Sequence, residues 1–158
     1  MNLTDKKTIL RKIPSGLFIV TAKDGEQGTG AVISFATQIS FDPVLIALAI
    51  RKDSRFYSVA KSNDYLAVHF PSIEQQAMVA SFFKIKNIGE NAINGFEFHW
   101  SDFSTPLLDD IPMILEVKIT DIVEKGDHPV FICEIVNAIL KEDVEILTMA
   151  DTNWHYGG

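Results

Sequence analysis

The sequence has very little cysteine and no long apolar run. Its single cysteine, Cys133, has no mate for a disulfide, which excludes a disulfide-stabilised secreted scaffold and indicates a reducing compartment. No apolar run reaches the roughly 20 residues of a membrane helix, and the opening residues MNLTDKKTILRKIPSG contain no apolar region of a signal peptide. We therefore expect a cytoplasmic protein that does not cross a membrane.

The motifs of several enzyme classes are also missing. The sequence has no Gly-x-Gly-x-x-Gly and no Gly-x-x-x-x-Gly-Lys, so it encodes neither Rossmann-type dinucleotide binding nor a P-loop. It has no Gly-x-Ser-x-Gly elbow, and Cys133 lies in an apolar strand, where we expect a buried and inert thiol. The four histidines are about thirty residues apart, without the spacing typical of metal ligands. We expect no metal site and no covalent catalysis.

Positive charge is scarce relative to negative charge. The chain has fourteen Lys and Arg residues and twenty-one Asp and Glu residues, which gives a net charge of −7 and disfavours nucleic acid as a partner.

The 158 residues suffice for one domain with a hydrophobic core, which we place at 1–158. The eleven Phe residues and the aromatic tail at Trp154 and Tyr156 provide more apolar surface than one small core hides, which favours a homodimer.

The hydrophobic patterns predict a mainly β protein. Helical spacing and capping signals predict three short helices, over 3–13, 54–61 and 72–83. Apolar and alternating runs predict strands at 17–22, from 29 onward, and at 44–50, 65–70, 96–100, 113–120, 130–140 and 144–149. Because the strands follow one another through tight turns, without βαβ alternation, we expect an antiparallel barrel with helices packed on its outside.

The stretch from Gly28 to Arg55 contains the best candidate binding site. A strand with interleaved hydroxyls offers rigid backbone groups to a planar ring, and Lys52, Ser54 and Arg55 at a helix start suit a phosphate. Together they suggest a nucleotide-like cofactor. The alternative is that the hydroxyls face solvent on an ordinary strand and that Ser54 is only an N-cap.

A second candidate is the turn Gly126-Asp127-His128 between the two strongest strands. It presents an imidazole whose charge changes near physiological pH. The alternative is a polar turn residue bonded to its own loop. The residues alone leave both interpretations open.

The order of these features resembles the flavin reductase-like, FMN-binding split-barrel family. The block runs from Gly30-x-x-x-Ser34-Phe35 through Ile-Ser-x-Asp-Pro and an apolar strand to the basic-x-Ser-Arg segment at 52–55, and Gly126-Asp127-His128 follows later. The likeness covers the chain from Arg11 to about Leu140. The chain departs from the usual family pattern at Val32, Asp53, His69 and Cys133.

The resemblance implies a split antiparallel β-barrel, Greek-key-like, with short flanking helices, that forms a homodimer. It implies an NAD(P)H-dependent flavin reductase that binds FMN, or FAD, uses NADH or NADPH as co-substrate, and passes reduced flavin to a partner such as a monooxygenase. The alternatives are a flavin-binding electron carrier or redox sensor without nicotinamide activity, and a barrel that has lost the cofactor and acts as an interaction module.

The resemblance also assigns roles to residues. The strand from 32 to 37 would face the flavin ring, through Val32, Ile33, Ser34, Phe35, Ala36 and Thr37. The basic segment after the next strand would hold the phosphate, through Lys52, Ser54 and Arg55, and Phe82 would border the pocket. His128, assigned as catalytic, would lie where the nicotinamide approaches.

Overall fold

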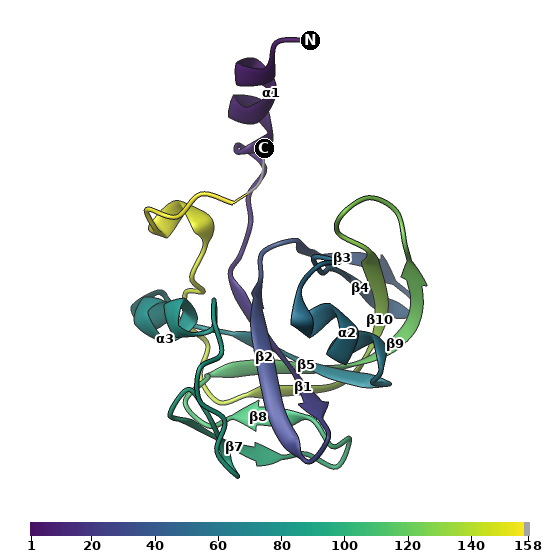
Figure 1. Ribbon diagram of the computed structural model, residues 1–158, viewed down its shortest axis with the longest axis vertical. Coiled ribbons are helices and arrows are strands. Elements are labelled where there is room, and N and C mark those ends of the chain that lie inside the picture. Colours follow the sequence, from purple (N-terminus) through teal and green to yellow (C-terminus); the bar gives the residue numbers. More distant parts are fainter. Residues whose placement is uncertain (157–158) are drawn as a thin grey trace.

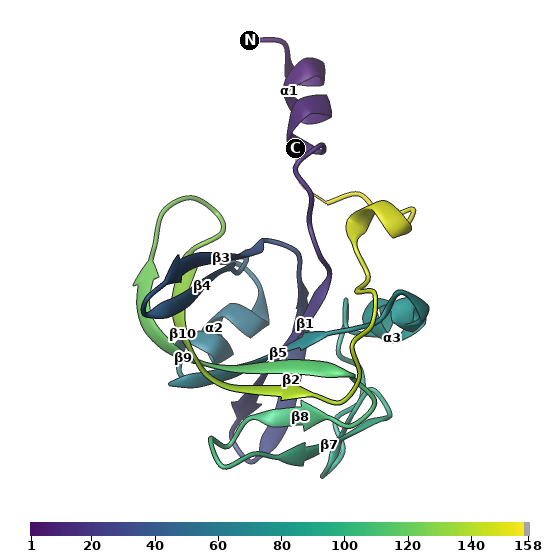
Figure 2. The ribbon, with the colours of Figure 1, turned by 180° about the vertical axis from the view of Figure 1, so that it is seen from behind.

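The structure is a computed structural model, and it describes residues 1–156 of the protein. Seven strands form one antiparallel sheet in the order β2-β1-β5-β9-β10-β4-β3, and three short strands form a second sheet in the order β6-β7-β8. The large sheet curves strongly, as Figure 1 and the reverse view in Figure 2 show. The prediction of a mainly β, antiparallel split-barrel fold is therefore confirmed.

The elements lie close to the predicted ranges. The large sheet contains β1 (Phe18–Asp24), β2 (Gln27–Ile33), β3 (Ala36–Phe41), β4 (Val44–Ala49), β5 (Tyr65–Phe70), β9 (Met113–Val123) and β10 (Val130–Leu140). The small sheet contains β6 (Ala92–Ile93), β7 (Phe96–Trp100) and β8 (Pro106–Leu108). The helices are α1 (Leu3–Leu10), α2 (Arg55–Lys61) and α3 (Gln76–Ser81), with 3₁₀ turns at Ile73–Gln75 and Met149–Asp151.

Helix α2 lies within the curve of the large sheet (Figure 1). Its residues Phe56, Tyr57, Val59 and Ala60 are buried in one core with side chains of β1, β2, β4, β5, β9 and β10. We expected helices on the outside of the barrel. Because four of its seven residues are apolar and buried, α2 instead fills the open side of the curved sheet.

Three other predicted elements differ from the structure. The strand expected over 32–37 is divided in two, since β2 ends at Ile33 and β3 begins at Ala36. The helix expected over 3–13 ends at Leu10, since Pro14 disfavours the helical conformation of the residue before it, and α1 projects from the body with no buried residue (Figure 1). The strand expected over 144–149 is absent. That segment forms only the isolated bridges Ser72 to Ile146 and Gly16 to Thr148, because it crosses between elements and does not join a sheet edge.

Local turn and cap signals are confirmed. The hairpin between β1 and β2 turns at Gly25, whose φ of +63° is open to glycine with little strain. The Ser72 backbone N–H donates to Gln75 Oε1 at 2.9 Å, as the capping signal before α3 predicts. Cys133 is buried, and burial raises the pKa of its thiol to about 12, which fits an inert residue.

His69 connects the two sheets through a buried imidazole. Its Nδ1 donates to the Ile19 carbonyl oxygen at 3.0 Å, and its Nε2 accepts from the Leu108 backbone N–H at 3.0 Å. Burial lowers the pKa of His69 to about 4, so the ring is neutral at physiological pH. The neutral tautomer thereby ties β5 to β1 on one side and to β8 on the other.

Among residues 1–156, no helix has the length and apolarity needed to cross a lipid bilayer.

Candidate functional site

A cavity of about 470 Å³ lies where β2 ends. Its walls come from β2 and the connection to β3, the segment after β4, the end of α3, the β9–β10 hairpin and the C-terminal segment. The lining residues are Leu17, Ala31, Val32, Ile33, Ser34, Phe35, Ala49, Ile50, Arg51, Ser54, Phe82, Phe83, His128, Met149, Trp154, His155 and Tyr156.

The cavity wall at β2 depends on close packing around Gly30. A Cβ atom at this position would lie 3.0 Å from the Val20 carbonyl oxygen and 3.3 Å from Cδ1 of Phe82. The missing side chain therefore lets Phe82 lie against β2, where its ring is almost fully buried. Phe82 lines the cavity on one side.

β2 is an edge strand of the large sheet, which leaves backbone groups available for a ligand. It pairs with β1 alone within that sheet, so alternate N–H and C=O groups on its other side have no partner strand. Ser34 follows β2 and is only 8% exposed, yet its hydroxyl makes no hydrogen bond within the described residues. The cavity thus offers backbone donors and acceptors and one uncommitted hydroxyl.

The opposite part of the cavity contains Arg51 and Ser54. Ser54 caps α2, since its Oγ accepts from the Tyr57 backbone N–H at 3.1 Å and donates to the Arg51 carbonyl oxygen at 2.7 Å. The guanidinium of Arg51 forms a two-point ion pair with Asp53, with Nη2 to Oδ2 at 2.7 Å and Nε to Oδ1 at 2.5 Å. The N-cap interpretation of Ser54 is therefore correct, and it coexists with a position on the cavity wall.

The Arg51 guanidinium also lowers the pKa of the Asp53 carboxyl through that hydrogen-bonded pair. The acidic side chain that departs from the family pattern is thus directed to an arginine. Arg51 itself was not singled out from the sequence. One feature of the sequence could have identified Arg51 as a site residue, namely its position as the first basic residue after β4, directly before Lys52.

Four of the predicted site residues do not line the cavity. Arg55 is 81% exposed at its side chain and forms an ion pair with Asp24, with Nη2 to Oδ2 at 2.8 Å. Lys52 is exposed, and its backbone N–H donates to the Asp127 carbonyl oxygen at 2.8 Å. Ala36 and Thr37 lie on β3, beyond the cavity. The structure brings together the other seven, namely Val32, Ile33, Ser34, Phe35, Ser54, Phe82 and His128.

His128 lies between a carboxylate and a phenol. Its Nδ1 lies 2.9 Å from Asp127 Oδ1, and its Nε2 lies 2.5 Å from the Tyr156 hydroxyl. The hydrogen bond from His128 lowers the pKa of Asp127. The ring also meets Phe35 edge to face, with centroids 5.3 Å apart. His128 is bonded to its own turn, and its ring also forms part of the cavity wall.

The C-terminal segment covers one side of the cavity. Trp154 packs edge to face on Phe83 with ring centroids 4.8 Å apart, and Tyr156 lies 5.4 Å from the Phe35 ring. Burial raises the pKa of the Tyr156 phenol. From the sequence this aromatic tail was interpreted only as surplus apolar surface, because nothing local indicates which cavity it covers.

Three comparisons relate the chain to known proteins. Residues 10–158 match the sequence model of the family described as "Flavin reductase like domain". The chain is similar to the ferric-chelate reductase (NAD(P)H) of Archaeoglobus fulgidus, with 26% identity over 142 residues that cover 89% of this chain and 84% of the relative. It is also similar to an NADH:FMN oxidoreductase of Rhodococcus qingshengii, with 26% identity over 145 residues that cover 89% and 72% of the two chains.

Among solved structures, the fold is similar to the NADH:FAD oxidoreductase of Streptomyces globisporus C-1027. The TM-score is 0.81 at 19% identity, and the match covers 100% of this chain and 96% of the other. At this identity the likeness concerns the fold.

Proposed function

The chain belongs to the flavin reductase-like family, and from this membership we propose that it is an NAD(P)H-dependent flavin oxidoreductase that binds FMN or FAD. The names of its relatives support this activity, since they describe reductases that use NADH or NAD(P)H. The proposal treats residues 1–158 as one domain. The single observation that carries it in the structure is the cavity at the end of β2.

The residues of this cavity fit a flavin. A planar ring with polar edges needs apolar walls and fixed hydrogen-bonding groups, and the cavity supplies Phe82 and Phe35 for the first and the free side of β2 for the second. Ser34 adds a hydroxyl that is uncommitted within residues 1–156. A flavin phosphate needs cationic and hydroxyl groups, and Arg51 and Ser54 lie on the same cavity wall.

We assign the ring to Val32, Ile33, Ser34 and Phe35, with Ala36 and Thr37 continuing the same chain segment. Bound flavin supplies the hydride-accepting chemistry, and the protein supplies position, shielding and electrostatics.

We propose that four residues bind the flavin phosphate, namely Ser54, Lys52 and Arg55 from the sequence prediction and Arg51 from the structure. The ion pair of Arg55 with Asp24 is exposed, and such pairs contribute less than about 1 kcal/mol, so a phosphate can compete for Arg55 at low cost. Arg51 already lines the cavity, and we therefore expect it to contribute more to phosphate binding than Arg55 does.

His128 is proposed to orient the nicotinamide of NADH or NADPH. The imidazole lies at the cavity wall beside Phe35, and Asp127 and Tyr156 hold its two ring nitrogens. A ring fixed at both nitrogens has little rotational freedom, which suits positioning of a second ring.

We further propose a homodimer and a cytoplasmic location. Large apolar side chains are exposed on the β3–β4 hairpin, with Phe41 at 86%, Ile39 at 47% and Val44 at 42%, and such side chains suit a protein interface. The single cysteine fits a reducing compartment. Reduced flavin would then pass to a partner, for which a monooxygenase is the candidate from the family resemblance.

Two measurements on the purified protein test this function. The absorbance spectrum after incubation with FMN and removal of excess reports flavin binding, and steady NADH or NADPH oxidation in the presence of FMN reports the reductase. We expect both. Flavin binding without nicotinamide oxidation would favour the electron carrier, and a protein that binds no flavin would favour the interaction module.

A further inference from the structure

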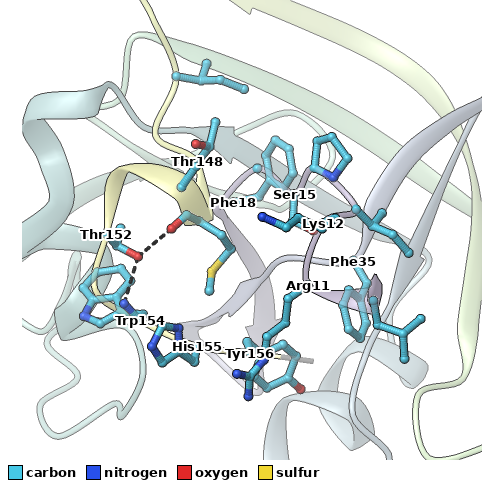
Figure 3. A pocket seen from close by; sticks show the side chains of 17 residues that line it. Arg11, Lys12, Ser15, Phe18, Phe35, Thr148, Thr152, Trp154, His155 and Tyr156 are labelled. Carbon is cyan, nitrogen blue, oxygen red and sulfur yellow. Dashed lines mark hydrogen bonds between the residues drawn. The ribbon is translucent and has the colours of Figure 1, made fainter. Parts of the chain in front are cut away.

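A second, larger cavity of about 860 Å³ adjoins the flavin cavity (Figure 3). It lies between the segment 10–16 that follows α1 and the C-terminal segment 146–156. Five residues line both cavities, namely Phe35, Met149, Trp154, His155 and Tyr156. The two spaces are therefore neighbours on either side of the same aromatic wall.

The second cavity is cationic in an acidic protein. Arg11 and Lys12 line it, and none of its lining residues is Asp or Glu, although the chain carries a net charge of −7. Within residues 1–156 neither Arg11 nor Lys12 forms an ion pair, whereas Arg51, Arg55 and Lys61 all do. In Figure 3 the side chain of Arg11 extends towards His155 and Tyr156. This cavity thus presents two uncompensated positive charges close to the shared wall.

The remaining lining suits a nucleoside. Ile13, Phe18 and Ile146 supply apolar surface, and the Ser15 hydroxyl supplies a polar group. The Thr148 hydroxyl also lines the cavity, but it donates to Asp151 Oδ2 at 2.7 Å and can only accept from a ligand. A cavity of this volume lies within the range of about 300–1,000 Å³ that is typical of small-molecule sites. Apolar walls with a few polar groups and two cations fit an adenosine that carries phosphate.

We propose that the second cavity binds the adenosine half of the nicotinamide co-substrate and that Arg11 and Lys12 select NADPH by binding its 2′-phosphate. The inference rests on the proposed reductase function. The nicotinamide must reach the flavin cavity, and the rest of the dinucleotide extends past the shared wall into the neighbouring space. NADPH carries a phosphate where NADH carries a hydroxyl, and a guanidinium fork binds phosphate with two parallel hydrogen bonds. Arg11 and Lys12 are therefore specificity-determining residues.

The kinetic test compares the two co-substrates in matched variants. Arg11→Gln/Lys12→Gln removes both cavity charges, and Lys7→Gln/Lys118→Gln removes two exposed charges that do not line the cavity. We expect kcat/KM of the parent protein to favour NADPH. The first variant should lose roughly 10- to 100-fold of kcat/KM for NADPH, with NADH changed by less than about 3-fold, and the control variant should keep the parent preference. An equal loss for both co-substrates, or a parent that prefers NADH, would overturn the inference.

A binding test needs neither flavin nor turnover. Isothermal titration with adenosine 2′,5′-bisphosphate and with adenosine 5′-monophosphate measures the contribution of the 2′-phosphate directly. We expect the bisphosphate to bind more tightly to the parent protein and the two ligands to bind alike in Arg11→Gln/Lys12→Gln. If the parent does not distinguish them, the inference is wrong even where the protein oxidises nicotinamide. If the parent distinguishes them but oxidises neither co-substrate, the proposed reductase fails while the 2′-phosphate site stands.

Discussion

The hydroxyl of Tyr156 lies 2.5 Å from Nε2 of His128, so the C-terminal segment contacts the imidazole at the edge of the cavity proposed to hold flavin. With Asp127 on Nδ1, this phenol completes the restraint of the ring. Two residues that are distant in sequence thereby form one unit of the proposed nicotinamide site.

Replacing His128 should slow flavin reduction and leave flavin binding intact. His128→Ala removes a ring that is held at both nitrogens and positions the nicotinamide by packing, and we expect the lost positioning to correspond to about 1–3 kcal/mol, or roughly 5- to 150-fold in rate. Stopped-flow reduction of bound FMN by NADH and by NADPH measures this. His99→Ala is the control, because His99 is exposed and pairs with Asp109 on the small sheet. If His128→Ala and the parent are reduced at equal rates, His128 serves only as a turn residue and the proposed role is wrong.

Tyr156→Phe should have a smaller effect in the same assay. The substitution removes one hydrogen bond to His128 and keeps the aromatic contact with Phe35, so we expect the reduction rate to fall roughly 2- to 10-fold. Tyr65→Phe is the matched control, since Tyr65 packs on Phe103 away from the cavity. In the His128→Ala background Tyr156→Phe should cause no additional loss. Fully additive effects would show that Tyr156 does not act through His128.

The phosphate assignment predicts a ranking of two arginines. Arg51→Ala should weaken FMN affinity roughly 10- to 100-fold, because a cationic residue that lines the cavity is lost, and Arg55→Ala should have the smaller effect. Fluorescence titration of FMN measures both, with Lys118→Ala as a control for net charge. A larger loss in Arg55→Ala would mean that Arg55 leaves Asp24 when flavin binds and that Arg51 serves mainly to pair with Asp53.

Acid should destabilise the fold through His69. Its pKa is lowered from 6.5 to about 4 in the folded protein, so the unfolded chain takes up the proton first as pH falls below 6.5. The stabilisation is therefore complete above pH 6.5 and is lost as pH falls towards 4. Between pH 7 and pH 5 the free energy of unfolding should fall by about 2 kcal/mol from this group alone.

Urea unfolding at the two pH values tests this effect of His69. His69→Gln should be less stable at pH 7, since one of the two buried hydrogen bonds is disturbed, and its stability should change less between pH 7 and pH 5. If the variant and the parent lose the same free energy, His69 is not the responsible group.

Much of the fold was predictable because its signals are local. The Asp24-Gly25 turn, the strand at 65–70 and the Ser72 cap each depend on a few neighbouring residues, and each is present. The segment 144–149 was not predictable in the same way. Its apolar residues match a strand, but whether they pair depends on which sheet edge lies beside them, and only isolated bridges form.

The candidate site was predictable where its residues are adjacent in the sequence. Val32 and Ile33 end β2, and Ser34 and Phe35 follow directly, so the resemblance located them together. Arg51 and Arg55 show the limit of sequence reasoning. They are four residues apart, yet Arg51 lines the cavity and Arg55 pairs with Asp24 at the surface. The positions of Trp154 and Tyr156 could not be predicted from the sequence, because their contacts with Phe83 and His128 depend on long-range packing.

Anaerobic mixing of the FMN-loaded protein with NADPH, followed through the visible absorbance band of the flavin, tests the central claim most directly. We predict that the band bleaches within the time of enzymatic turnover and returns when air is admitted, with free FMN at the same concentration unchanged on that time scale. A protein that holds FMN but keeps its oxidised spectrum with both NADPH and NADH would contradict the assignment of a nicotinamide-dependent flavin reductase.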